Sequence, residues 1–133
     1  MDSFQPFHDA VVGAVCLGLV QQAYYFNDVL EEPANAIYLK FAEGRFARFG
    51  ISAAGFFWRE TGWVEMITVA GPNHAYPLTD LGAEIGVLGQ RVISVDFGNM
   101  FDGSSKLTIG FENGVQLSLI HEEWKTRLEI IPA

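Results

Sequence analysis

Positive charge is scarce in this chain of 133 residues. Lysine and arginine together number 8, against 16 aspartate and glutamate residues, so the formal net charge is −8. Proteins that follow nucleic-acid phosphates gain affinity by neutralising them with a basic patch. A surface this acidic repels a polyanion over most of its extent. We therefore expect no nucleic-acid binding.

Cysteine is nearly absent too. Cys16 is the single cysteine, so the chain can form neither an intramolecular disulfide nor a zinc site built on a cysteine pair. Cys16 lies in an apolar stretch, where a thiol is typical of a small buried hydrophobe. A reactive thiol is the alternative.

The sequence also lacks the pattern of a secretory leader or a membrane span. Asp2 and Asp9 stand where a leader needs positive charge, and no cleavable apolar stretch follows directly. The apolar run 10–20 is too short to cross a bilayer and contains two glycines. We expect a protein of the reducing cytoplasm that makes no membrane contact.

Catalytic motifs are missing as well. The chain contains no Gly-x-Ser-x-Gly elbow, Walker loop or Gly-x-Gly-x-x-Gly fingerprint, and no two histidines four residues apart. The most suggestive cluster is His121, Glu122 and Glu123, but consecutive residues of an extended segment point to alternate sides. We predict a solvated turn there, with no metal, no cofactor and no enzymatic activity.

What the chain does contain is an internal repeat. Ile37–Gly44 returns as Leu107–Gly114, without a gap, 70 residues later. In the second copy, apolar residues alternate with polar ones on both sides of the turn, as in half-buried strands. A three-residue loop ending at Gly114 pairs Ile109 with Leu117 and keeps the apolar side chains on one face, whereas a one-residue slip exposes half of them. Such a loop needs a left-handed residue, which glycine supplies.

The first copy follows the same rule. A loop over 42–44 matches Ile37, Leu39 and Phe41 with the apolar residues of 47–51 on one face. The other face interleaves aromatic and cationic side chains, namely Tyr38, Lys40, Phe46 and Arg48. Cross-strand aromatic–cation packing on a solvated face explains this pattern. A recognition surface is the alternative.

The remaining pattern predicts one domain over residues 1–133, built from two similar halves. A short helix or turn is expected over 2–12, and strands over 15–26, 56–60, 63–70, 91–97 and 124–130. We predict that Ile93, Val95 and Phe97 point inward. In the closing strand, Trp124, Thr126, Leu128 and Ile130 alternate with Lys125, Arg127 and Glu129. Residues 27–35 read as an acidic loop, 71–77 as a Gly/Pro linker between the halves (about 1–70 and 78–133), and 79–89 as a short helical turn.

Upstream of the hairpins the repeat has two alternative alignments. Residues 12–17 resemble 88–93, each with a glycine before a strand, which requires a longer loop in the first half. The gapless alignment instead matches Ala23 and Tyr25 with Ile93 and Val95. Either way the fold class is mainly β, with α+β as the alternative: two related antiparallel meanders forming a sandwich or one strongly curved sheet.

Residues 88–95 and 107–117, both strand-and-turn patterns, resemble small bacterial immunity-type proteins and related uncharacterised β-rich domains. The resemblance implies a non-catalytic acidic protein that neutralises a cognate toxin, often a cationic nuclease, by filling its basic cleft. The expected partner-binding residues lie in acidic loops that precede the repeated hairpins or in the His121 cluster: Asp28, Glu31, Glu32, Asp96, Asp102, His121, Glu122 and Glu123.

A homo-oligomeric ligand-binding or scaffold domain is the second hypothesis. Four large aromatic side chains, Phe56, Phe57, Trp58 and Trp63, crowd one short segment. Packing in the core explains them, whereas exposure would mark an interface, for instance of a homodimer.

Overall fold

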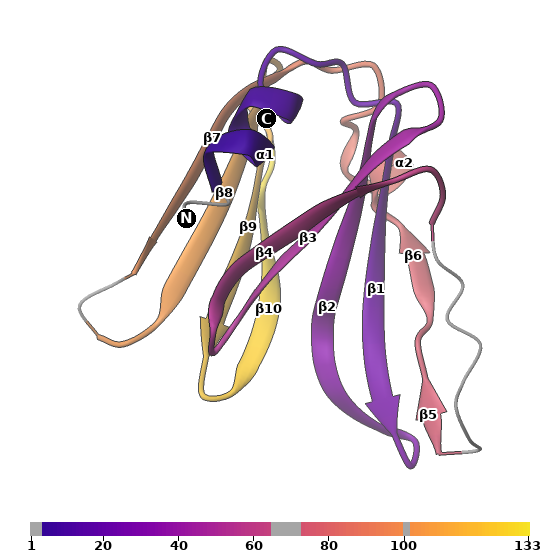
Figure 1. Cartoon of the computed structure of the whole chain (residues 1–133), viewed down its shortest axis with the longest axis vertical. Helices are drawn as coiled ribbons and strands as arrows, with labels where there is room; N and C mark the ends of the chain where they lie inside the picture. Colours follow the sequence, from indigo (N-terminus) through magenta and orange to yellow (C-terminus); the bar gives the residue numbers. More distant parts are fainter. Residues whose placement is uncertain (1–3, 65–72, 100–101) are drawn as a thin grey trace.

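The computed structural model describes residues 4–64, 73–99 and 102–133. Two antiparallel sheets face each other, with a short helix at one end (Figure 1). The elements in chain order are α1 (Phe4–Val11), β1 (Gly18–Phe26), β2 (Val29–Ala42), β3 (Arg45–Ser52), β4 (Gly55–Thr61), β5 (His74–Ala75), β6 (Leu78–Asp80), α2 (Leu81–Ile85), β7 (Val92–Asn99), β8 (Ser105–Phe111), β9 (Gln116–Glu122) and β10 (Lys125–Ile131). The predicted β-rich sandwich with a short N-terminal helix is confirmed.

Each sheet is built mainly from one half of the chain. The first has the order β4-β3-β2-β1, and both β5 and β6 pair with the free side of β1. The second has the order β10-β9-β8-β7. Residues 74 and 75 of the predicted linker therefore form a strand, while 71 and 72 lie outside the described residues. Most of the strand predicted over 63–70 lies outside them too.

One core fills the space between the sheets. β10 packs against β2, and β3 packs against β8 and β9. The core takes side chains from both sheets, among them Leu19, Leu39, Phe49, Ile109 and Leu117, all almost fully buried. Each buried side chain of this size contributes about 1.5–3 kcal/mol to the free energy of unfolding.

Helix α1 closes one end of this core. Its apolar residues Phe4, Phe7 and Val11 recur at the spacing of one helix face. Phe7 is fully buried, and its ring centroid lies 4.8 Å from that of Phe49 and 5.7 Å from that of Trp58. The helix thus packs against β3 and β4 of the first sheet.

Both repeated hairpins have the predicted strand register. Ile109 pairs with Leu117, and Ile37 pairs with Phe49. The second turn is the predicted three-residue loop with Gly114 at φ +95°. In the first, a bulge at residue 41 pairs Ala42 with Arg45, so the turn itself is Glu43-Gly44 rather than the predicted 42–44 loop.

The two halves are related by approximate two-fold symmetry. Val15 bridges Arg91, its own counterpart 76 residues later. The flanking backbone bonds are reciprocal under this offset: Cys16 N–H donates to the Gln90 carbonyl oxygen, and Val92 N–H to that of Ala14, each at 2.8 Å. The structure therefore selects the match of 12–17 with 88–93, which requires the longer loop in the first half, over the gapless alignment. Gly13 and Gly89 also correspond, and both have positive φ.

Three predicted details are wrong, and each has a local cause. Residues 27–35 do not form a loop: Asn27-Asp28 is a tight turn, and β2 already begins at Val29. Ile93 points outward and is 56% exposed because a bulge between Val92 and Ser94 shifts the alternation of β7. Trp124 lies in a turn before β10 and is 84% exposed.

The aromatic–cation face of the first hairpin is present but more covered than predicted. Tyr38 is fully buried, and its hydroxyl accepts a hydrogen bond from Arg48 Nε at 3.2 Å. The Arg48 guanidinium also lies over the ring of Phe57, 5.6 Å from its centroid. Lys40 lies over Phe46 in the same way.

Within the described ranges, no helix has the length and apolar character needed to cross a bilayer.

Candidate functional site

Four connections gather at one end of the sandwich, which we call the hairpin end (Figure 1). They are the turns at 27–28, 53–54 and 123–124 and the β7–β8 connection, of which residues 102–104 are described. The opposite end carries α1, α2 and the turns at 43–44 and 112–114. Most of the predicted partner-binding residues lie at the hairpin end, although in two separate regions.

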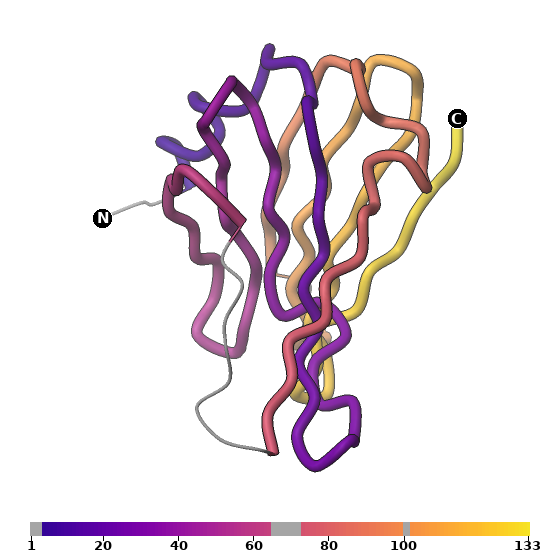
Figure 2. The backbone as a smooth tube through the Cα atoms, turned by 90° about the vertical axis from the view of Figure 1, so that its right-hand side faces the viewer, coloured from indigo at the N-terminus to yellow at the C-terminus, as the bar shows by residue number. Residues whose placement is uncertain are grey.

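The first region is the outer part of the β1–β2 hairpin, residues 23–32, which we call the arm. Twenty positions separate the paired residues Leu19 and Leu39, but only fourteen separate their counterparts Val95 and Ile109. The first hairpin is thus six residues longer than its equivalent. The arm reaches beyond the β9–β10 turn in two perpendicular views (Figures 1 and 2).

The arm carries a stack of aromatic rings. The ring of Tyr24 stacks on His74, with centroids 5.8 Å apart, and on Tyr76, with centroids 5.0 Å apart. A hydrogen bond of 2.8 Å joins the Tyr24 hydroxyl to His74 Nδ1. The ring of Phe26 also packs against His74, with the two centroids 5.1 Å apart. β5 and the residue after it thus hold two rings against β1, which fixes all of them in place.

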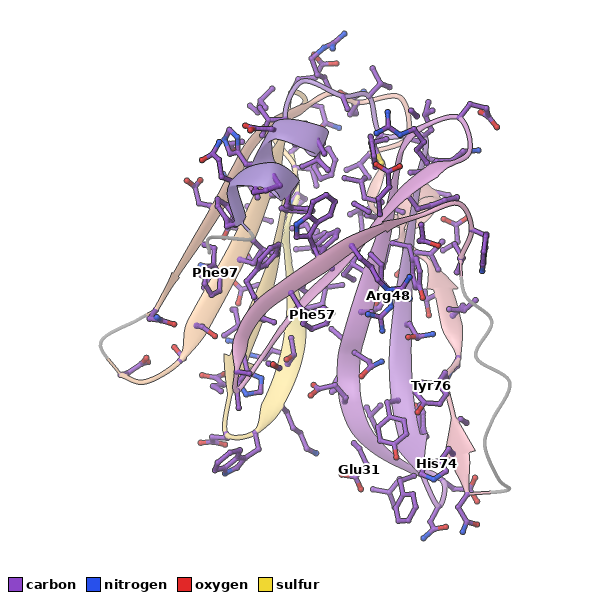
Figure 3. The ribbon with its side chains drawn as sticks, viewed as in Figure 1. Glu31, Arg48, Phe57, His74, Tyr76 and Phe97 are labelled. Carbon is purple, nitrogen blue, oxygen red and sulfur yellow. The ribbon has the colours of Figure 1, made fainter. Side chains whose placement is uncertain are left out.

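Acidic side chains lie on the same arm as this stack. Asp28 and Glu31 are exposed on the arm, and Figure 3 shows Glu31 at the same end as His74 and Tyr76. The pKa of Tyr24 is raised, first by burial and then by electrostatic interaction with Tyr76 and with the carboxylate of Glu31. Neither segment of this region, 21–36 or 73–80, contains a lysine or arginine. The arm can therefore accept a cation but not an anion.

The second region is a cleft of about 330 Å³ between the other turns of the hairpin end. Its lining comes from three connections and includes Ser52, Asn99, Gly103, Ser105, His121, Glu122, Glu123 and Trp124. Asp102 and Ser104 extend it on the second sheet. Turn residues of both sheets thus line this cleft, and Gly103, Glu122 and Glu123 also line the adjoining depression that contains Asp102.

Thr126 fixes the histidine of this cleft. Its hydroxyl has one proton and donates it to the Ile51 carbonyl oxygen at 2.9 Å, since that oxygen can only accept. The hydroxyl oxygen must then accept from His121 Nδ1, 2.9 Å away. Nδ1 of His121 therefore carries a proton, and in the neutral ring the lone pair is on Nε2.

Glu32 connects the arm to the second sheet. Its carboxylate accepts a hydrogen bond from the backbone N–H of Thr126. Burial raises the pKa of Glu32, although that hydrogen bond and the nearby His121 and Lys125 act in the opposite direction. Glu32 is therefore half-buried and structurally engaged, unlike its neighbour Glu31.

The other predicted acidic residues differ in whether neighbouring groups already bind their carboxylates. Glu122 forms a salt bridge of 2.9 Å with Arg127. Asp102 accepts hydrogen bonds from the Ser104 hydroxyl and N–H, which lower its pKa. Glu123 is exposed in its turn, and Asp96 is exposed on β7, next to Lys106 in a separate shallow depression. The structure thus brings Asp102 and Glu123 together but leaves Asp96 apart.

Of the four aromatic residues of the second hypothesis, two face the core. Phe56 and Trp58 pack against α1, and Phe56 also lies 5.8 Å from Phe97 of β7. Phe57 packs on the outer face with Arg48 (Figure 3). Trp63 is 66% exposed.

Sequence reasoning missed the ring stack and the role of Thr126. Tyr24 and the pair His74 and Tyr76 are fifty residues apart, and the pairing of β5 with β1 has no local signal in the sequence. The alternate spacing of His74 and Tyr76 was the one available sign, because residues two apart in a strand share a face.

Among the described residues, no group of three or more His, Cys, Asp and Glu side chains is arranged to hold a metal ion. Comparisons with protein-family models, curated proteins and solved structures found no match to this chain.

Proposed function

We propose that this chain is a non-catalytic binding protein whose hairpin end engages a basic surface of a protein partner. One observation carries the proposal: acidic side chains from three different hairpins, Asp28 and Glu31, Asp102, and Glu123, are presented at the same end. None of the four takes part in an ion pair with another described residue, whereas Lys40, Arg45 and Arg127 are each paired with a carboxylate.

This charge distribution favours a cationic partner. Unpaired carboxylates at one end, on a chain of net charge −8, steer a basic protein towards that end and speed its association. Lys40 and Arg45, which flank the turn at 43–44 of the opposite end, are each paired with a carboxylate and offer little attraction to an acidic partner. The exposed arm also protrudes, so a partner can recognise its shape as well as its charge, which a flat acidic face does not allow.

The partner class that we propose is a basic toxin domain, so that the chain would act as an immunity protein in the cytoplasm. The resemblance of residues 88–95 and 107–117 to immunity-type proteins supports this assignment. Cys16 is buried and free, and burial raises the pKa of its thiol to about 11, so a reactive thiol is not part of this proposal.

The test is binding of the protein encoded by the neighbouring gene, followed by kinetics at several salt concentrations. The first variant combines Asp28→Asn, Glu31→Gln, Asp102→Asn and Glu123→Gln. We expect its association rate to fall about tenfold or more, with a weaker dependence on salt. The matched control, Asp9→Asn, Glu43→Gln, Glu84→Gln and Glu112→Gln, removes the same charge from the opposite end. Equal losses in both variants, or no association at all, would contradict the proposal.

A homo-oligomeric ligand-binding domain is the second candidate, supported by a different surface. A groove of about 470 Å³ is lined by Leu17, Leu78 and Leu88, all at least 37% exposed, together with Phe46 and Lys40. Exposed apolar surface of this kind is typical of interfaces. Sedimentation over a range of concentrations distinguishes the candidates, since a monomer at all concentrations excludes self-association.

A further inference from the structure

The ring stack of the arm is more ordered than an exposed surface requires. Tyr24, His74 and Tyr76 come from two segments fifty residues apart, and stacking and one hydrogen bond hold them in place. None of the three belongs to the apolar core or to the side chains that pack against it. Each is only partly buried. The stack therefore adds little to the core and presents fixed aromatic surface at the hairpin end.

The surroundings of the stack select the charge of a ligand. Glu31 is close enough to Tyr24 to act on it electrostatically, and Asp28 lies at the tip of the same arm. Within 21–36 and 73–80 the charged residues are Asp28, Glu31, Glu32 and Asp80, all acidic. An anion would be repelled, and the exposed carboxylates would lose solvation beside a purely apolar ligand.

Aromatic faces beside a carboxylate are suited to a cation. Tyrosine rings attract cations through their quadrupole, within about 6 Å of the centroid. A planar guanidinium gains twice at such a site, because it stacks on the ring and also donates paired hydrogen bonds to a carboxylate. An ammonium group is a compact, strongly hydrated charge and gains less.

We propose that the Tyr24–His74–Tyr76 stack and Glu31 form a subsite for an arginine side chain of the basic partner, with the guanidinium on the aromatic surface and Glu31 as its acceptor. The subsite rests on the proposed function and specifies which partner residue the arm recognises. Rings already fixed by their neighbours lose little conformational freedom on binding, which makes this part of the surface an efficient anchor.

The equivalent hairpin of the second half provides an internal comparison. It is six residues shorter, and the described part of its connection, residues 102–104, carries Asp102 and no aromatic residue. Within the described part of the two hairpins, both carry exposed acidic residues, but the stack of rings belongs to the arm and β5. Arginine selectivity should therefore depend on the arm, while general attraction of cations depends on both.

The experiment uses oligoarginine and oligolysine peptides of equal length, titrated into the full chain at low ionic strength and followed by calorimetry and proton NMR. We expect oligoarginine to bind about fivefold more tightly, with ring-current shifts of its side-chain δ protons. Tyr76→Leu should abolish the preference and the shifts, and Glu31→Gln should weaken oligoarginine binding several-fold. Trp63→Leu and Glu84→Gln remove an exposed ring and an exposed carboxylate elsewhere. Both variants should keep the preference for oligoarginine and the ring-current shifts of the parent.

Equal binding of the two peptides, or Tyr76→Leu behaving like Trp63→Leu, would overturn the subsite. If Asp102→Asn and Glu123→Gln reduced binding while the arm variants did not, the subsite would be wrong but the acidic hairpin end would stand as the binding region. If neither peptide bound and the protein of the neighbouring gene also failed to associate, both proposals would fall. The circular dichroism spectrum of each variant confirms that loss of binding is not loss of fold.

Discussion

The two halves of this chain share a scaffold and differ at its ends. Both have a glycine of positive φ before the first strand and a glycine-containing repeated hairpin, and they pair through Val15 and Arg91 at equivalent positions. In the first half the helix has eight residues rather than five and buries Phe7, and the first hairpin is six residues longer. What the halves share builds the sandwich, and what distinguishes them adds a stack of rings to an acidic, exposed end.

The helices provide the largest expected difference between the halves. At the repeat offset, Phe7 of α1 corresponds to Ala83 of α2, and only Phe7 is buried. Phe7→Ala removes a ring that contacts Phe49 and Trp58, so we expect a loss of about 3–5 kcal/mol in the free energy of unfolding. Ala83→Gly should cost about 1 kcal/mol through helix propensity alone. Urea denaturation measures both, and similar losses would mean that the two helices contribute alike.

The glycines before the first strands should instead behave alike. Gly13 and Gly89 have φ of +90° and +81°, and an added Cβ would meet no atom within 4 Å at either. Gly13→Ala and Gly89→Ala should each destabilise the fold by about 1–2 kcal/mol, from backbone conformation alone. Gly98→Ala, at an open position without positive φ, is the control and should change little. Clearly unequal losses at positions 13 and 89 would break the two-fold correspondence.

The smallest expected effect concerns Glu32, which has a raised pKa in the folded state. Folding therefore favours the neutral form of the Glu32 carboxyl group. The contribution of Glu32 to the free energy of unfolding is complete below the ordinary glutamate pKa, and it is lost as the pH rises through the higher pKa of the folded state. Glu32→Gln keeps an acceptor for the Thr126 N–H. It should match the parent in acid and be slightly more stable near neutral pH.

The pH series needs one comparison variant. Glu31→Gln removes a charge from the adjacent exposed residue and should give no such divergence from the parent. If Glu32→Gln were less stable than the parent at neutral pH, attraction to His121 and Lys125 would outweigh burial, and the stated sign would be wrong.

The sequence was informative where alternation was unbroken. The β8–β9 register follows from Ile109 and Leu117 because a slip would expose the apolar face. Prediction failed at two turns that contain no glycine: Asn27-Asp28 and Glu123-Trp124 all have positive φ, between 50° and 68°. Two-residue hairpin turns need this conformation, and asparagine and aspartate adopt it more readily than tryptophan does.

Missing the turn at 27–28 had the larger consequence for the site. With Pro33 and three acids nearby, the segment read as a loop, and the arm was not recognised. The acids themselves were identified, but the rings that accompany them were not, because pairing between β5 and β1 joins segments about fifty residues apart. Long-range pairing of a two-residue strand leaves no periodic pattern to read.

The most direct test of the account is to shorten the arm to the length of its counterpart. Deleting the six residues Phe26–Glu31 removes its acidic tip but leaves the core pairing of Leu19 with Leu39 in place. We predict a folded protein, judged by cooperative thermal unfolding, that has lost its preference for oligoarginine and binds the protein of the neighbouring gene at least tenfold more weakly. A folded deletion variant that binds both as tightly as the parent would contradict the central claim that the arm is the binding element.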